Sequence, residues 1–296
     1  MRTDMKAKLV GLVFILPAIA LFCVFVVYPI VFNIQASTLD WDGVNVGTFV
    51  GLGNYPELFQ DPVFVKTLRN SLWWIVLTII PQCFLGFFLA YMLDGPLRGR
   101  TIYRVVFFLP TILSPVVVGI VWKQILDPAN GVFAQIGRSI GAEWMAQPWL
   151  SSPSTAIFAA IFVNVWMWTG FSMLFYLAGL QLVDPAVIEA AMIDGANARQ
   201  LVVHIIWPLL KPTHISLVLL GIIGSLKTFE LVYMLTEGGP NHASEMMPTY
   251  IFQEAFRQQN VGYASTISVV LLVVAMAASL SMMRVFGSGF ITGDDR

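Results

Sequence analysis

Charged side chains are scarce in this chain of 296 residues. They make up 11% of it, whereas ordinary soluble domains have about 25%, and hydrophobic residues make up 57%. This composition excludes an ordinary soluble domain and favours a chain that lies in a bilayer. The formal net charge of −1 offers no basic surface for a nucleic acid.

Cysteine and histidine are scarce as well. Cys23 and Cys83 both fall in apolar stretches, which gives neither a disulfide framework nor a CxxC metal site, and we interpret them as small apolar residues. The three histidines are scattered, and no HExxH, GxSxG or acid-rich metal motif is present. The sequence therefore carries no signature of a metal centre or of a membrane-embedded enzyme. Internal repeats and low-complexity linkers that would divide the chain are also missing.

Long apolar runs, in contrast, are abundant. A helix needs about 20 apolar residues to cross a hydrocarbon core of roughly 30 Å. The first run is far longer than the apolar region of a secretory signal, which has about 7–15 residues. We expect an all-α membrane protein with one transmembrane domain at 9–286, between short termini at 1–8 and 287–296. Its six helices are predicted at 9–34, 71–93, 103–125, 155–180, 209–235 and 262–286.

The distribution of Lys and Arg predicts the orientation of these helices. Six crossings put both termini on one side of the membrane, and basic residues concentrate on the cytoplasmic side. Ten of the 16 fall in the segments on the side of the termini, five fall in the opposite loops, and Lys227 falls in a span. Both termini and the loop at 181–208 are therefore predicted to be cytoplasmic. The ten are Arg2, Lys6, Lys8, Arg98, Arg100, Arg104, Arg199, Lys211, Arg284 and Arg296, and the five are Lys66, Arg69, Lys123, Arg138 and Arg257.

The loop at 181–208 contains residues that typically begin and end helices, and they predict two short helices. Its sequence is QLVDPAVIEAAMIDGANARQLVVHIIWP. Asp184 can cap the first, with Pro185 at its first position and Gly195 at its end. Asn197 can cap a second, which Pro208 interrupts. The first helix is slim because of its alanines, and this suits insertion into a groove of another protein. An amphipathic helix on the lipid surface explains the pattern equally well.

This loop resembles the cytoplasmic signature of the permease subunits of ATP-binding-cassette importers. That signature is EAA, three residues, Gly, nine residues, Ile, one residue and Leu-Pro, and here Trp207 replaces the leucine. In that family the elbow is a coupling helix that is seated in a cleft of the ATPase subunit. The resemblance assigns this role to Glu189, Ala190, Ala191, Asp194, Gly195 and Pro208.

Three further stretches are similar to the carbohydrate-importer permeases of that family. They are YRVVFFLPTILSPVVVGIVWKQIL from 103, the elbow itself, and the outer loop TEGGPNHASE from 236. The resemblance implies two ATPase subunits, a second and non-identical permease, an extracytoplasmic solute-binding protein and a sugar-like solute. It implies a bacterial cytoplasmic (inner) membrane and no cofactor in this chain, because ATP and Mg²⁺ belong to the ATPases. A non-sugar solute is the first alternative.

Polar residues inside a membrane helix are candidates for a solute pathway. On the predicted fifth helix, Ser225 and Thr228 lie on one side, and they resemble residues that line the sugar site in the family. Lys227 and Glu230 lie on the other side, where they either form an ion pair with each other or contact the solute.

The fourth and third helices add further candidates. Asn164, Trp168 and Phe171 share one face of the fourth helix, which suits a sugar platform, although aromatic residues at this spacing are equally typical of packing or lipid contact. An amide facing lipid would lack partners, so Asn164 is harder to explain by packing. On the third helix, Thr111 and Ser114 flank Pro110 and Pro115, which can kink the helix near the pathway.

Two other interpretations of the sequence are weaker. GIIGSLKT at 221–228 nearly matches a phosphate-binding P-loop, but Leu226 replaces the second glycine and the stretch lies deep in an apolar run. An ion-coupled secondary transporter would favour paired intramembrane carboxylates and inverted repeats, whereas Glu230 is the lone acid at mid-span. We therefore expect a partner to supply ATP hydrolysis.

Overall fold

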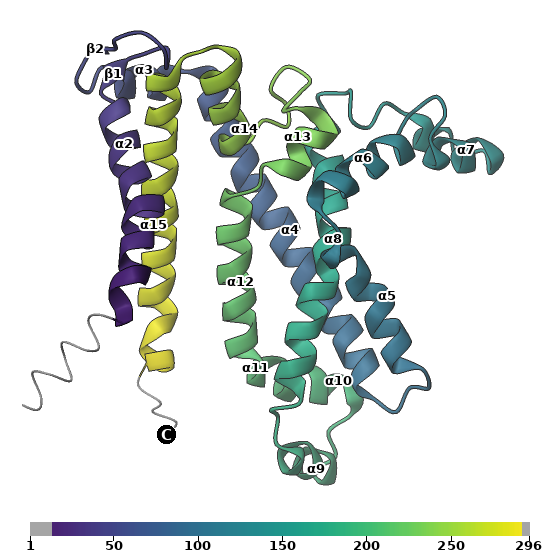
Figure 1. Ribbon diagram of the computed structural model, residues 1–296. Coiled ribbons are helices and arrows are strands. Elements are labelled where there is room, and N and C mark those ends of the chain that lie inside the picture. Colours follow the sequence, from purple (N-terminus) through teal and green to yellow (C-terminus); the bar gives the residue numbers. More distant parts are fainter. Residues whose placement is uncertain (1–13, 292–296) are drawn as a thin grey trace, which may run out of the picture. The chain divides into compact units, whose positions relative to one another are not determined.

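The computed structural model describes residues 14–291 of the chain. Within this range the residues form two compact units, 14–61 with 250–273 and 62–249 with 274–291. Both units are almost entirely helical (Figure 1). The predicted N-terminal segment 1–8 and residues 292–296 of the predicted C-terminal segment 287–296 lie outside the described residues. The limits 9–286 of the transmembrane domain stay a prediction.

The first unit contains an exposed apolar helix and the loop that follows it. The helix runs through Phe14–Ala36 and is long and apolar enough to cross a membrane. Asn54 ties the loop to the helix end by donating to the carbonyls of Ser37 and Leu39 at 3.0 Å each. The elements of this unit are η1 (Cys23–Val27), α2 (Tyr28–Ala36), β1 (Leu39–Asp40), β2 (Thr48–Phe49), α3 (Asn54–Gln60), η4 (Gln253–Arg257) and the first part of α15 (Val261–Ile291). Strands β1 and β2 form a small antiparallel pair.

Asp61 joins the two segments of the first unit. Its Oδ2 accepts hydrogen bonds from the hydroxyls of Tyr250, at 2.5 Å, and Tyr263, at 2.9 Å. Thr266 on α15 also donates to the Ser37 carbonyl at 3.2 Å. These polar contacts hold α15 against the end of the first helix.

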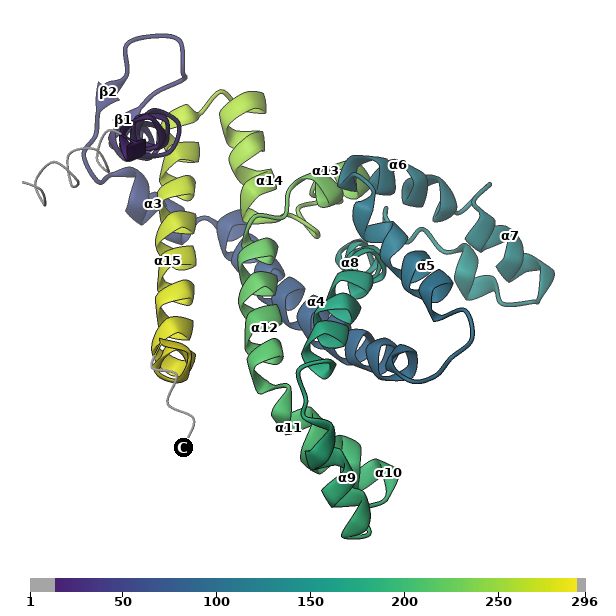
Figure 2. The same ribbon diagram turned by 60° about the horizontal axis from the view of Figure 1, so that its bottom comes forward.

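The second unit is built around two long helices, α4 and α8, which pack along each other (Figures 1 and 2). One core cluster surrounds Trp74 and Met167, and a second surrounds Phe87 and Tyr176. The elements are α4 (Pro62–Asp94), α5 (Arg100–Ile112), α6 (Pro115–Ile125), α7 (Val132–Ser139), η2 (Glu143–Ala146), α8 (Ala156–Leu180), α9 (Pro185–Ile193), α10 (Ala198–Gln200), η3 (Leu201–Ile206), α11 (Trp207–Leu209), α12 (Lys211–Leu226) and α13 (Glu230–Thr236). Helix α14 (Met247–Phe252) begins in this unit.

Four helices of the described chain are long and apolar enough to span a membrane by themselves, and the number rises to six if each of two bent pairs counts as one span. The four are Phe14–Ala36, Pro62–Asp94, Ala156–Leu180 and Val261–Met282. They confirm the second, fourth and sixth predicted helices and the described part of the first, whose residues 9–13 lie outside the described residues. Helix α4 begins nine residues before the predicted start at 71.

The third predicted helix, 103–125, is broken rather than continuous. Helices α5 and α6 meet at an angle of 97°. Ser114 has an extended backbone, and Pro115 occupies the start of α6. The predicted kink is confirmed and is sharper than expected, because a residue before proline is driven out of the helical region. Pro110 lies inside α5 and does not end it.

The prediction of one continuous fifth helix at 209–235 was wrong. Helix α12 ends at Leu226, and α13 begins at Glu230. The tertiary structure explains this break, because α13 packs against α6 whereas α12 packs against α4. The P-loop-like stretch begins within α12, so it lacks the strand and loop that bind phosphate.

The sequence predicted that Pro208 interrupts the second elbow helix, but the structure shows no interruption there. The helix continues to Leu209 and bends by 63° before α12. The preceding turn, Leu201–Ile206, is π-helical, and the Trp207 N–H bonds the Val202 carbonyl. This wider turn changes the hydrogen-bond register and accommodates the missing N–H of proline.

Candidate functional site

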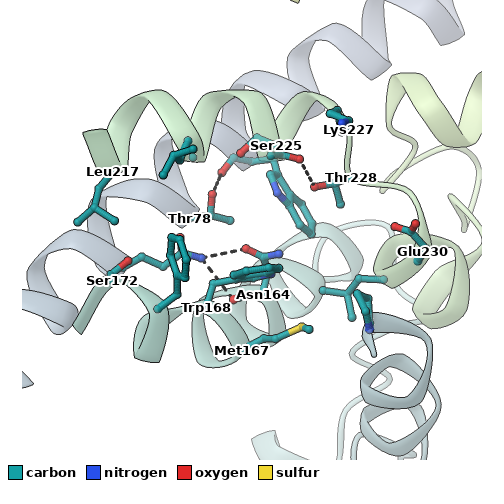
Figure 3. Close-up of a pocket in the computed structure, with 18 residues that line it drawn as sticks. Thr78, Asn164, Met167, Trp168, Ser172, Leu217, Ser225, Lys227, Thr228 and Glu230 are labelled. Carbon is teal, nitrogen blue, oxygen red and sulfur yellow. Dashed lines mark hydrogen bonds between the residues drawn. The ribbon is translucent and has the colours of Figure 1, made fainter. Parts of the chain in front are cut away.

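A cavity of about 340 Å³ lies in the second unit, beside both helix breaks. Pockets of roughly 300–1,000 Å³ are typical of small-molecule sites. Its wall combines α4, α8 and α12 with the first residues of α6 and α13 (Figure 3). The lining residues are Trp74, Thr78, Gln82, Pro115, Asn164, Met167, Trp168, Phe171, Ser172, Leu217, Leu220, Gly221, Gly224, Ser225, Lys227, Thr228, Glu230 and Leu231.

The structure brings together all the predicted solute-pathway residues except Thr111. The Thr111 hydroxyl donates to the Met167 carbonyl on α8 at 2.8 Å. It thus joins α5 to α8 and is not among the residues that line this cavity, so its place on the pathway stays a prediction. The hydroxyl of a threonine in an apolar helix can hydrogen-bond either a solute or a carbonyl of a neighbouring helix. Here it bonds the carbonyl of a neighbouring helix.

Asn164 is the best-oriented polar group of the cavity. Its side chain is buried, and its Oδ1 accepts a hydrogen bond from Gln82 Nε2 at 2.9 Å. Gln82 also reaches the Asn164 carbonyl at 3.3 Å. Within residues 14–291, Asn164 Nδ2 has no recorded partner, so its two N–H groups remain available to acceptor oxygens in the cavity.

Ser225 precedes the last residue of α12, and Thr228 follows the end of this helix by two residues. Ser225 is buried in the last turn, and the Thr228 hydroxyl donates to the Gly224 carbonyl at 3.0 Å. The same carbonyl accepts the Lys227 N–H at 3.1 Å, so Thr228 adds a second hydrogen bond at the end of α12. The hydroxyl oxygen keeps its acceptor capacity toward the cavity.

Lys227 and Glu230 do not form the predicted ion pair among the described residues. The argument that placed them on one helix face assumed a continuous helix, whereas Lys227 follows the end of α12 and Glu230 begins α13. Figure 3 shows both residues with Thr228 at one end of the cavity. The break therefore brings two opposite charges to the cavity without joining them.

Aromatic rings supply the apolar part of the wall. Trp168 and Phe171 pack edge to face with ring centroids 5.9 Å apart, and Trp168 is 37% exposed. Both line the cavity, so packing against other helices is not their only contact. Trp74 from α4 is fully buried behind the same space.

Sequence reasoning missed the contribution of α4. Trp74, Thr78 and Gln82 recur every four residues on this helix, so they share one face. A polar amide in an otherwise apolar span was the available signal, by the same argument that identified Asn164. Ser172 on α8 was missed as well, and it lines the opposite end of the cavity from Lys227 (Figure 3).

The elbow helices have the predicted caps. Asp184 Oδ1 accepts the Ala186 N–H at 2.9 Å at the start of α9. Gly195 follows the end of α9 with φ +82°, a conformation that disfavours other residues. Asn197 and Gln200 then cap α10 reciprocally, at 2.9 Å in each direction.

The elbow projects beyond the ends of α8 and α12 in both views (Figures 1 and 2). Glu189 and Ala190 are exposed, while Ala191 faces inward. Two large apolar side chains of this segment are almost fully exposed, Leu182 at 87% and Ile193 at 85%. An apolar projection of this kind is typical of a protein-binding surface.

The elbow is also tied to the two helices that carry the cavity. His214 on α12 has both ring nitrogens engaged, Nε2 with the Trp207 carbonyl at 2.9 Å and Nδ1 with the Tyr176 hydroxyl at 2.7 Å. The carbonyl can only accept, so Nε2 donates and Nδ1 accepts from Tyr176. The end of the elbow, α8 and α12 therefore meet at one histidine.

The chain matches the family model described as "Binding-protein-dependent transport system inner membrane component" over residues 82–289. It is 35% identical over 285 residues to a probable ABC transporter permease protein, YurN, of Bacillus subtilis, covering 95% of this chain and 97% of YurN. It is 34% identical to the lactose transport system permease protein LacF of Rhizobium radiobacter, covering 94% and 93% of the two chains.

A solved structure with the same fold is a chain of a bacterial ABC transporter involved in the import of the acidic polysaccharide alginate. The two chains superimpose with a TM-score of 0.84 and cover 98% of each other at 24% sequence identity. At this identity the likeness concerns the fold.

Proposed function

Because the chain belongs to the family of binding-protein-dependent transport system inner membrane components, we propose that it is the permease subunit of an ATP-driven importer of a sugar or sugar-like solute. The chain is a multi-pass inner-membrane protein. It acts as a transport subunit and not as an enzyme, and this family argues against the ion-coupled transporter that the sequence left as an alternative.

The cavity beside the two helix breaks carries this proposal. It combines N–H groups of Asn164, hydroxyls of Ser225 and Thr228, and the rings of Trp168 and Phe171. A sugar has hydroxyls that both donate and accept, and C–H faces that stack on aromatic rings. The lactose permease among the relatives supports a sugar as the solute.

The elbow of α9 and α10 is the proposed contact with an ATPase subunit. Glu189, Ala190, Ala191, Asp194, Gly195 and Pro208 are assigned to this coupling contact. ATP-driven closure of two ATPase subunits would push the elbow, and the His214 junction would pass the movement to α8 and α12, which line the cavity. ATP and Mg²⁺ bind to those subunits, and this chain needs no cofactor of its own.

A second, non-identical permease would complete the pathway, and a solute-binding protein would deliver the solute to the outer loops. The family description, binding-protein-dependent transport, supports the latter partner. The excess of Lys and Arg near the termini and the elbow supports a cytoplasmic position for the termini and for the elbow.

The test uses the complete importer, reconstituted in liposomes with its binding protein and a radiolabelled sugar. Thermal-shift screening of the binding protein against mono- and oligosaccharides selects the sugar. We expect Asn164→Ala and Thr228→Ala to reduce uptake, while the ATPase subunits stay bound. Ser216→Ala is the matched control, because Ser216 lies on α12 outside the cavity and only bonds the Pro212 carbonyl. Uptake at the wild-type rate after substitution of Asn164, Trp168, Ser225 and Thr228 would contradict the proposed site.

A further inference from the structure

Helix α7, between the third and fourth predicted spans, exposes a stripe of apolar side chains. Val132, Ile136 and Ile140 follow one another at intervals of four residues and are 57%, 47% and 68% exposed. At 100° per residue they lie within about 80° of one another around the helix axis. Monomeric soluble surfaces rarely leave such a continuous apolar stripe uncovered.

The opposite face of α7 is fixed by its own loop, so the stripe cannot turn inward. Ala134 and Gly137 are buried on this face. A Cβ on Gly137 would lie 2.6 Å from Cβ of Met145 in η2, which shows how closely the two segments pack. Arg138 holds the start of the loop by donating to the carbonyls of Ala129 and Pro128 at 2.9 and 2.6 Å.

The exposed surface of α7 is divided into an apolar and a polar part. Gln135 and Ser139 are exposed and lie next to the stripe, within about 60° of Val132 on the side away from Ile136. The helix thus has three sides, one packed on η2, one apolar and one polar. A helix that lies in the plane of a membrane interface has this arrangement, with its apolar side toward the acyl chains and its polar side toward water.

Aromatic residues connect α7 with the exposed face of a membrane-spanning helix. Trp144, which is 61% exposed, packs edge to face on Phe133 of α7 at 6.2 Å. Phe133 and Trp122 of α6 pack against the same core cluster, and Trp122 meets the exposed Phe162 of α8 at 5.6 Å. Tryptophan is enriched at membrane–water interfaces, because its ring is apolar and its N–H is polar.

We propose that α7 binds the lipid surface, with Val132, Ile136 and Ile140 immersed at the boundary between headgroups and acyl chains. Helix α7 precedes the first residue of α8 and the elbow follows its last, so this anchor lies at the opposite end of that span (Figure 1). The bilayer already surrounds the span, and Phe133 of α7 packs against the same core cluster as Trp122 of α6, whose members include buried residues of α8. The anchor would hold the ends of α6 and α8 at a fixed depth in the membrane.

Spin-label accessibility tests this proposal in the complete importer, reconstituted in nanodiscs of phosphatidylethanolamine and phosphatidylglycerol. Single cysteines replace Val132, Ile136, Ile140, Gln135 or Ser139 in a Cys23→Ala, Cys83→Ala background. Oxygen partitions into lipid, whereas a nickel chelate stays in water. We expect the ratio of oxygen to nickel accessibility to be several-fold higher at Val132→Cys, Ile136→Cys and Ile140→Cys than at the matched positions Gln135→Cys and Ser139→Cys. Retained ATPase activity identifies the labelled variants that are folded.

Two results would overturn the proposal. High nickel accessibility along the stripe would place α7 in water. Low accessibility to both reagents would mean that a protein surface, from the second permease or the binding protein, covers the stripe. Quenching of a bimane label at Ile136→Cys by brominated lipid gives an independent measurement, and its absence in the folded importer would contradict lipid contact.

Discussion

Asn164 and Gln82 form the polar pair on which the cavity depends. Gln82 satisfies the buried Oδ1 of Asn164 and so directs the Asn164 N–H groups toward the cavity. Gln82→Leu should leave this oxygen without its partner, at a cost of about 1–3 kcal/mol, and should raise the KM for uptake. The double variant Gln82→Leu, Asn164→Leu should lose little more than the worse single variant, because both act on one interaction. Uptake kinetics of the two single variants and the double variant, with Ser216→Ala as control, measure these changes in KM. Additive losses of uptake in the double variant would mean that Gln82 and Asn164 act separately.

At the scale of single residues, the sequence identified a cavity-lining residue where burial of a polar group was the deciding argument. An amide in an apolar helix needs a partner wherever the helix packs, so Asn164 could be identified without a structure. Thr111 could not be assigned in this way, because a hydroxyl can bond a carbonyl of a neighbouring helix as well as a solute. The relation between Lys227 and Glu230 depended on the backbone between them, which the sequence did not determine.

At the scale of elements, the backbones of α5 and α8 come close together at Gly170. A Cβ there would lie 2.1 Å from the Phe107 carbonyl oxygen, which belongs to the backbone and cannot move by itself. Gly170→Ala should therefore separate the helices and destabilise the chain by about 1–3 kcal/mol. Thermal unfolding of the purified importer measures this effect. Gly224→Ala is the matched control, because it has nothing within 4 Å of the added Cβ, and equal unfolding temperatures for the two variants would contradict the close contact.

The elbow allows a similar comparison of two glycines. Gly195 and Gly141 both have positive φ, +82° and +74°, and an added Cβ at either would meet nothing within 4 Å. Proline fixes φ near −65°, so Gly195→Pro and Gly141→Pro should distort their loops to a similar degree. We expect only Gly195→Pro to reduce co-purification of the ATPase and abolish uptake, as Glu189→Lys should by changing the charge of the contact. Normal transport in both Gly195→Pro and Glu189→Lys would refute ATPase docking at α9.

The sequence predicted those elements whose causes are local. Apolar length predicted the continuous spans, and the cap residues Asp184, Gly195 and Asn197 predicted the ends of the elbow helices. Pro115 predicted a kink but not an angle of 97°. The break at 227–229 contains neither proline nor glycine, and it depends on the packing of α13 against α6, which only the folded chain shows.

At the scale of the whole molecule, the cavity and the elbow are mechanically connected within the second unit. Helix α8 carries Asn164 toward the cavity and Tyr176 toward His214, and α12 carries Ser225 and His214 in the same two directions. A displacement of the elbow should therefore move both walls of the cavity together. A subunit that converts the closure of an ATPase into alternating access requires this kind of rigid connection.

The predicted orientation in the membrane is the premise on which this mechanism depends. In intact cells, a membrane-impermeant maleimide should label Ser139→Cys in the loop at 127–153 and should leave Arg199→Cys in the elbow unlabelled until the membrane is permeabilised. Both positions are exposed, so burial does not bias the comparison, and Cys23→Ala, Cys83→Ala supplies the background. The excess of Lys and Arg on the side of the elbow is the physical reason, because basic loops are retained in the cytoplasm. The reverse labelling pattern would place the elbow outside the cell, where ATP-driven coupling through α9 is impossible.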